Sequence, residues 1–247
     1  MSLPPQLEKL IRKTPIEGLA RKILRKAGFD IIRAPIPEVG ILSNYDINLI
    51  LDVGANIGQY AMRKRSLSYT GKIVSFEPIS SVFAELTKNA ASDPRWQTVN
   101  TGLGNYDGEA EINISQWSVF SSILNSLPVL EEYPESKYVS QEKIKVSKLD
   151  SIFSEYYQPG DRVFLKIDTQ GYEKNVLEGA KSSLKYITGI QLELSFITEL
   201  YEGELLLMEM VELLSKQGFT LVFLEPLNHN LISGKLLQGD GIFVRLN

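Results

Sequence analysis

The residues best placed to do chemistry lie in a tight turn after an apolar segment, Leu49–Val53. The turn reads Asp52-Val53-Gly54-Ala55-Asn56-Ile57-Gly58. In an open α/β sheet, ligands bind beyond the carboxyl ends of the strands. A glycine there lets the backbone approach a ligand, and amides at a helix start favour an oxygen-rich or negative group. We therefore expect a ligand to be bound by Asp52, Gly54, Ala55, Asn56 and Gly58, although glycines that serve only the shape of the turn are an alternative.

The spacing of these glycines excludes two nucleotide-binding loops. The dinucleotide fingerprint requires G-x-G-x-x-G, whereas Gly54 and Gly58 form G-x-x-x-G, and no segment matches the phosphate loop G-x-x-x-x-G-K-[ST]. An acid at the strand end would repel a pyrophosphate, but it suits a ligand that carries an amino group.

A second acid, Glu77, ends the next predicted strand and is followed by Pro78. In nucleotide-binding α/β folds, an acid near this position accepts both ribose hydroxyls. An acid for an amino group and an acid for a ribose together predict S-adenosylmethionine as the cofactor. Gly102 and Leu103, after the third strand, would admit its adenine ring and pack on it, although the same residues also fit a simple turn.

Composition limits the remaining chemistry. The 247 residues contain no Cys and a single His, which excludes thiolate chemistry and multi-histidine metal sites. No metal site is predicted, although the acids leave metal dependence open. With 26 Lys plus Arg against 30 Asp plus Glu, the formal charge is -4, so no nucleic-acid partner is expected. No apolar run could span a membrane and no signal peptide is recognised, so we expect a cytoplasmic protein.

From residue 47 onward, short apolar runs alternate with helical segments. This alternation predicts an α/β fold with a mostly parallel sheet that is covered by helices on both faces. The predicted strands are Ile47–Val53, Lys72–Glu77, Gln97–Asn100, Val163–Asp168, Gly189–Leu194, Thr220–Leu224 and Gly241–Arg245. The predicted helices are 57–67, 80–91, 172–186 and 203–217.

Three regions stand apart from this pattern. Residues 6–27 have helical spacing and a net charge of +5, which indicates a solvated helix or a peripheral contact with an acidic surface such as lipid headgroups. Pro35–Gly40 is predicted to be a linker. Segment 105–149 indicates an inserted hairpin. Within it, the aromatic residues of 116–140 suit either a substrate cap or a lid packed on the domain: Trp117, Phe120, Tyr133 and Tyr138.

Four motifs together resemble the FkbM-like methyltransferases: Leu51–Gly58, Phe76–Pro78, Ser121-Ser122 and Leu165–Glu173. The resemblance covers about residues 47–245. It implies the class I methyltransferase fold, a Rossmann-like seven-stranded sheet, with S-adenosylmethionine as cofactor and a further cofactor contact at Asp168. The domain organisation would be an N-terminal helical extension, residues 1–40, and a methyltransferase domain, residues 41–247, that contains the insertion. Where the family commonly has D-x-E-G, this chain has Gln170, so no carboxylate function carries over to that position.

A hydroxyl that accepts a methyl group must lose its proton, so a base is needed. Asp168 ends the central predicted strand and Glu193 ends the next one, so both are candidate bases. Lys166 shares a sheet face with Asp168, which makes it a catalytic candidate or a structural ion-pair partner. His229, in the segment after the sixth strand, is a further candidate base or an exposed side chain.

The sequence therefore predicts an S-adenosylmethionine-dependent O-methyltransferase that acts on a hydroxyl of a sugar, a glycan or a natural product. Two alternatives stay open. One is an RNA 2′-O- or N-methyltransferase, because Lys166, Asp168 and Glu193 loosely resemble the sets used by ribose methylators. The other is a cofactor-binding module without catalysis. The oligomeric state is open as well.

Overall fold

The computed structural model describes residues 37–229 and 234–246. Contacts divide the chain into Met1–Pro37 and Glu38–Asn247, and the fold described below is that of the second unit. The helix predicted over residues 6–27 lies outside the described residues. No helix in the described part of the chain is long and apolar enough to cross a bilayer.

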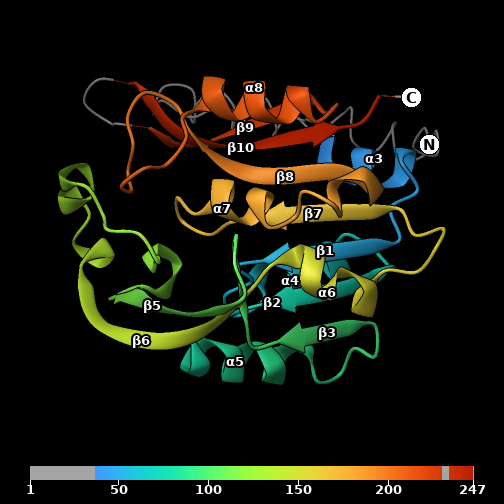
Figure 1. Cartoon of the computed structure of the whole chain (residues 1–247), viewed down its shortest axis with the longest axis horizontal. Helices are drawn as coiled ribbons and strands as arrows, with labels where there is room; N and C mark the ends of the chain where they lie inside the picture. The colour runs from blue at the N-terminus through green and yellow to red at the C-terminus, as the bar shows by residue number, and fades with distance from the viewer. Residues whose placement is uncertain (1–36, 230–233, 247) are drawn as a thin grey trace, which may run out of the picture. The chain divides into compact units, whose positions relative to one another are not determined.

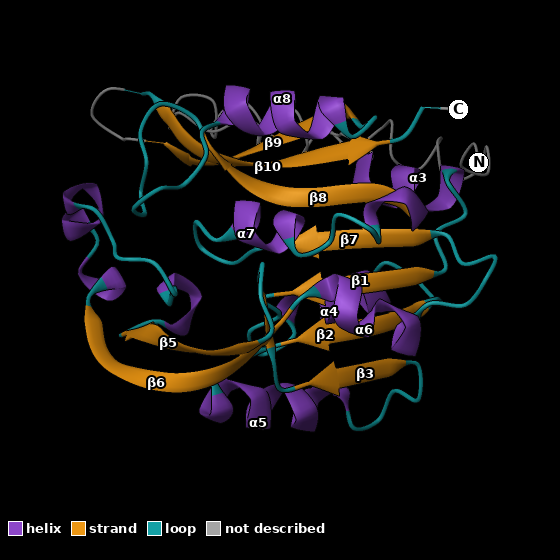
Figure 2. Cartoon of the chain, viewed as in Figure 1, coloured by secondary structure: helices purple, strands orange, loops and turns teal. Residues whose placement is uncertain are grey.

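A seven-stranded sheet with the order β3-β2-β1-β7-β8-β10-β9 forms the centre of this unit (Figure 2). Within it β10 alone runs in the opposite direction to the other six strands. Every residue of the central strands β1 and β7 is buried, as near-continuous apolar sequences predict. This topology confirms the class I methyltransferase fold. The strands are β1 (Leu49–Val53), β2 (Lys72–Phe76), β3 (Trp96–Val99), β7 (Val163–Ile167), β8 (Ile187–Ser195), β9 (Thr220–His229) and β10 (Leu236–Val244).

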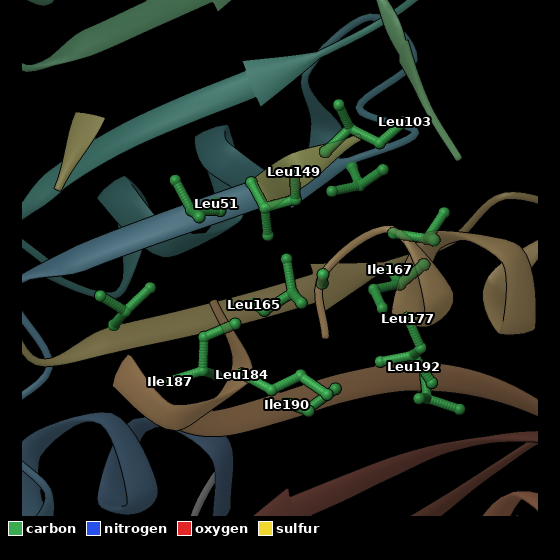
Figure 3. Close-up of a cluster of buried hydrophobic side chains, with 14 of the residues drawn as sticks. Leu51, Leu103, Leu149, Leu165, Ile167, Leu177, Leu184, Ile187, Ile190 and Leu192 are labelled. Atoms are coloured by element: carbon green, nitrogen blue, oxygen red, sulfur yellow. The ribbon is translucent and has the colours of Figure 1, made fainter. Parts of the chain in front are cut away.

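Helices cover both faces of the sheet. On one face α6 (Leu149–Tyr156), α7 (Glu173–Glu178) and α8 (Leu207–Lys216) pack on a core that includes Leu51 and Leu165 (Figure 3). On the other face α3 (Pro37–Asn44), α4 (Gln59–Ser66) and α5 (Ser80–Ala90) cover Ile50, Ile73 and Phe164. Successive side chains of each strand therefore point in turn into the core on one face and the core on the other.

The inserted hairpin is confirmed. β4 (Gly102–Leu103), β5 (Gly108–Ser115) and β6 (Tyr138–Ser147) form a second sheet in the order β4-β6-β5, and β5 pairs with β6 in antiparallel fashion. Figure 1 shows this hairpin on the side to which the arrowheads of β2, β3 and β7 point. Residues 116–137, here called the cap, connect β5 to β6 through the short helices η1 (Ser118–Phe120), η2 (Pro128–Glu132) and η3 (Pro134–Ser136).

The linker prediction is wrong for most of its length, because the chain is helical from Pro37 onward. Helix α3 is fixed by a buried ion pair between Glu38 and Lys64 of α4, a contact that the local sequence does not reveal. The boundary proposed at residue 40 consequently falls inside a helix.

The prediction of a single helix over residues 172–186 is also wrong. Helix α7 ends at Glu178, and η4 (Leu184–Tyr186) follows as a separate turn. At Gly179 a Cβ atom would lie 1.8 Å from the carbonyl oxygen of Gly104, so this glycine is needed where two backbone segments meet. Helix α6 was not predicted.

Gly54 opens the turn after β1 with φ of +72°, and a Cβ there would lie 1.8 Å from the carbonyl oxygen of Asp168. Gly54→Ala is expected to lose at least ~1–3 kcal/mol of unfolding free energy, measured by urea denaturation, because it combines backbone strain with this overlap. The control is Gly40→Ala in α3, where a Cβ meets nothing within 4 Å. It should be neutral or stabilise by up to ~1 kcal/mol. Equal stability of the two variants would contradict the tight turn.

Candidate active site

A cavity lies at the carboxyl edge of the seven-stranded sheet. Strand ends contribute Val53, Asp168 and Glu193 to its lining, and η1 of the cap contributes Phe120. This is the edge at which open α/β sheets bind ligands.

Most of the predicted cofactor-binding residues line this cavity: Gly54, Asn56, Glu77, Pro78, Gly102, Leu103 and Asp168. Asp52, Ala55 and Gly58 are not among the lining residues. Ala55 is buried in the core beneath α4. A Cβ at Gly58 would lie 2.5 Å from the Trp96 ring, so Gly58 allows close packing and does not face a ligand.

The backbone amides of the turn are already used within the protein. Each N–H from Gly54 to Gly58 donates a hydrogen bond of 2.9 to 3.1 Å. The acceptors, in order, are the carbonyl of Phe76 for the first two, Oε2 of Glu77, Oδ1 of Asn56 and the carbonyl of Ala55. The expectation that these amides point at a ligand is therefore not met, because the chain supplies their acceptors itself.

Glu77 is buried directly after β2 and lines the cavity. Its Oε2 accepts the N–H of Asn56 and its Oε1 accepts the N–H of Ile79, each at 2.9 Å. Burial raises the pKa of Glu77 to about 7, although these two N–H groups and the Lys166 charge act to lower it. Each oxygen keeps a lone pair for a further donor.

A row of polar side chains crosses four adjacent strands next to the cavity. Ser75 of β2, Asp52 of β1, Lys166 of β7 and Gln191 of β8 are register neighbours. Lys166 Nζ lies 3.0 Å from Asp52 Oδ1, and Asp52 Oδ2 accepts the Ser75 hydroxyl at 3.0 Å. Asp52 is fully buried in this row, so the ligand amino group predicted for it is out of reach.

Lys166 also holds residues that line the cavity. Its Nζ lies 3.5 Å from Asp168 Oδ2 and donates to the Gly54 carbonyl at 3.2 Å. Burial alone would lower the pKa of Lys166, but the carboxylates of Asp52 and Asp168 outweigh burial and raise it above its ordinary value. Lys166 therefore stays cationic at neutral pH, and it is placed to fix Asp168 and not to take up a proton.

Glu193 lines the cavity from β8 and is the register partner of Asp240 on β10. Burial and the neighbouring charges of Asp168 and Glu173 raise the pKa of Glu193 well above its ordinary value. A carboxyl group with a raised pKa holds a proton more tightly than an exposed one, which suits Glu193 to accept a proton from a hydroxyl.

Sequence reasoning missed Gln170 as part of the site. Its Nε2 donates to Asp168 Oδ1 at 2.9 Å and to Glu193 Oε2 at 3.3 Å, and its Oε1 accepts the Tyr201 hydroxyl at 2.9 Å. The sequence marked this position only as a departure from the family pattern. Two of its three partners, Glu193 and Tyr201, come from distant parts of the chain, so no local signal could have revealed these contacts.

Several hydrogen bonds hold the cap over the cavity, among them two that involve residues lining it. Asn56 Nδ2 donates to Ser118 Oγ at 2.9 Å, and Ser122 Oγ donates to the Gln170 carbonyl at 2.7 Å. Of the cap aromatics singled out above, Phe120 lines the cavity, whereas Trp117 is exposed. The other two are structural: Tyr133 packs on the Leu130 cluster, and the Tyr138 hydroxyl donates to the Leu124 carbonyl.

Two further predictions concern His229 and a metal. The backbone of His229 ends β9 opposite Leu236, but its side chain lies outside the described residues, so its use as a base stays a prediction. Among residues 37–229 and 234–246, no group of acids or His is arranged to hold a metal ion.

Comparison with known proteins decides the family. Residues 52–221 match the methyltransferase FkbM domain. The chain belongs to this family. A relative of this FkbM methyltransferase is the 2-O-methyltransferase NoeI of Sinorhizobium fredii. The two are 28% identical over an alignment of 174 residues, which covers 67% of this chain and 70% of NoeI.

Solved structures resemble this FkbM methyltransferase more distantly. An rRNA methylase from Streptococcus thermophilus has a TM-score of 0.49 at 11% identity, over 88% of this chain and 99% of that one. Fibrillarin from Aeropyrum pernix, solved with natively bound S-adenosyl-L-methionine, has a TM-score of 0.44 at 8% identity, over 80% and 66%. The strand order, and not these similarities, carries the fold assignment.

Lys166→Met should lose about 3–5 kcal/mol of unfolding free energy, because it leaves Asp52 charged and buried without its cation. Denaturant unfolding measures this loss. The double variant Asp52→Asn with Lys166→Met removes both charges and should regain part of the loss. If the double variant is no more stable than Lys166→Met, the loss comes from packing and the charge balance described here is wrong.

Proposed function

We propose that this FkbM methyltransferase binds S-adenosylmethionine in the cavity and transfers its methyl group to a hydroxyl of a neutral, sugar-like acceptor. The observation that carries the proposal is the position of Glu77. Its carboxylate lines the cavity at the end of β2, beside the Gly54 turn, and has acceptor capacity left for the two ribose hydroxyls.

The remaining lining residues fit the other parts of this cofactor. Ile79, Leu103 and Ile112 offer apolar surface for an adenine ring. Asp168, held by Lys166, is an anionic acceptor for the amino group. When bound, the cofactor supplies a methyl group on a positively charged sulfur that leaves with the bonding electron pair.

The charge of the cavity favours a neutral acceptor. Among the described residues that line it, the charged ones are Glu77, Asp168 and Glu193, and none is Lys or Arg. Negatively charged carboxylates repel the phosphate groups of a nucleic acid, which disfavours the RNA alternative. NoeI is named a 2-O-methyltransferase, which supports a hydroxyl oxygen as the acceptor atom.

Within this proposal, the chain's own residues align the acceptor and move one proton. Glu193 takes the proton of the acceptor hydroxyl as that oxygen forms its bond to the methyl carbon, and later releases the proton to water. Asp168 stays paired with Lys166 and fixes the position of the reacting groups. Phe120 and the rest of η1 cover the cavity from the cap side.

Glu77→Gln should weaken binding of S-adenosylmethionine, measured by calorimetry, by ~1.5–3 kcal/mol, the range for hydrogen bonds to a charged group. Because the pKa of Glu77 is about 7, wild-type affinity should fall as the pH drops through about 7 and the charged acceptor is protonated. Glu77→Gln should lack this component of the pH dependence. Glu85→Gln, on the exposed side of α5, is the control that keeps both properties. Wild-type affinity and pH dependence in Glu77→Gln would remove Glu77 from the site.

Transfer is tested by incubating the full chain with S-adenosylmethionine and panels of neutral glycans, nucleotide sugars and RNA, and following S-adenosylhomocysteine. We expect product with a neutral hydroxyl acceptor. Glu193→Gln should retain cofactor binding and lose transfer by roughly 10²–10⁴-fold, the usual contribution of a general base. Product with RNA alone would contradict the acceptor class. Loss of transfer in His229→Ala with full activity in Glu193→Gln would assign the base to His229.

A further inference from the structure

The side-chain amide of Gln170 lies between the two acids at the reaction end of the cavity. Its nitrogen donates to Asp168 and to Glu193, while its oxygen accepts the hydroxyl of Tyr201. The backbone at Gln170 is left-handed, with φ of +53°, and Gly171 follows with φ of +90°. A Cβ at Gly171 would lie 2.6 Å from that of Tyr201, so the turn is packed tightly against the residue that the amide contacts.

The chemistry of these partners fixes which way the amide points. The Asp168 carboxylate, paired with Lys166, accepts hydrogen bonds, so the amide nitrogen faces Asp168, and Oε2 of Glu193 accepts from the same nitrogen. Tyr201 is buried, and burial raises its pKa above the ordinary value, so its hydroxyl keeps its proton. It donates this proton to the amide oxygen at 2.9 Å, with the Phe120 carbonyl as a more distant acceptor at 3.4 Å. A glutamate at this position would have the same shape, but it would accept where the amide donates.

Four other acids act on the charge of Glu193. They are Asp168 after β7, Glu173 on α7, Asp240 on β10 and Glu204 in the segment before α8. The Lys166 ammonium is engaged by Asp52 and Asp168. A neutral donor between Asp168 and Glu193 offsets part of their repulsion without adding a further charge.

We infer that Gln170 is a positioning residue whose amide holds Asp168 and Glu193 together at the reaction end of the cavity and connects them to the cap. The connection to the cap runs through the Ser122 hydroxyl, which donates to the Gln170 carbonyl. The inference rests on the proposed function for what the two acids do, whereas the hydrogen bonds that define the positioning are independent of it.

The test is a carboxyl titration by ¹³C NMR of the full chain labelled at Asp and Glu. Gln170→Glu replaces the donor by a like charge and should raise the pKa of Glu193 by about 1 unit or more. Gln170→Met is neutral and of similar length, removes only the hydrogen bonds, and should raise this pKa by a smaller amount. Gln97→Glu, at an exposed position of β3, adds the same charge far from the site and should leave the Glu193 titration unchanged.

A wild-type Glu193 titration in both Gln170 variants would overturn the inference, as would an equal shift in Gln97→Glu. If Gln170→Glu does not fold, Gln170→Met alone decides between these outcomes. The titration uses neither cofactor nor acceptor, so failure of the wild-type protein to bind S-adenosylmethionine would contradict the proposed function and leave this result intact.

Discussion

Lys166 carries a full positive charge inside the central sheet, and the buried carboxylate of Asp52 on the next strand is the charge that balances it. The same ammonium reaches the Gly54 carbonyl and Asp168, so one cation fixes both the turn after β1 and the acid after β7. Removing Lys166 would leave the buried Asp52 carboxylate without its cation. The pairing of β1 with β7 is consequently specified by charge as well as by apolar contact, and the cavity takes its shape from that pairing.

Buried acids in and near the cavity cost stability at neutral pH. Burial raises the pKa values of Glu77 and Glu173 to about 7, above the ordinary value of ~4.3. The folded state therefore holds these protons more tightly than the unfolded state. The stability that they contribute is complete below pH ~4.3 and is lost as the pH rises to about 7. Glu77 lines the cavity, so hydrogen-bond donors on a ligand would offset its part of this cost by stabilising the charged carboxylate, and binding and stability would be linked at this residue.

Local patterns predicted the sheet, because buried parallel strands are apolar over their whole length, and they identified Glu77, Asp168 and Glu193 because strand ends meet at one edge. Long-range contacts decided the rest. The sequence near Asp52 does not show that its carboxylate forms an ion pair with Lys166. It also does not show that the turn amides donate hydrogen bonds to acceptors within the chain. Helix α6 had a readable signal, since Leu149, Ile152, Phe153 and Tyr156 recur at helical spacing, but it was hidden beside the irregular insertion. The hydrogen bonds of Gln170 depend on a left-handed turn that a glutamine seldom adopts, so only the structure reveals them.

The cap leaves the second sheet after Ser115 and returns at Tyr138, and these two residues are partners across β5 and β6. Both ends of the cap are thus anchored at one point on a sheet separate from the seven strands that hold the acids. A segment anchored in this way can be lengthened, shortened or replaced without altering the strand register beneath it. Insertions and deletions among related chains are therefore expected to concentrate in residues 116–137, while the seven-stranded sheet that holds the acids keeps its length and register.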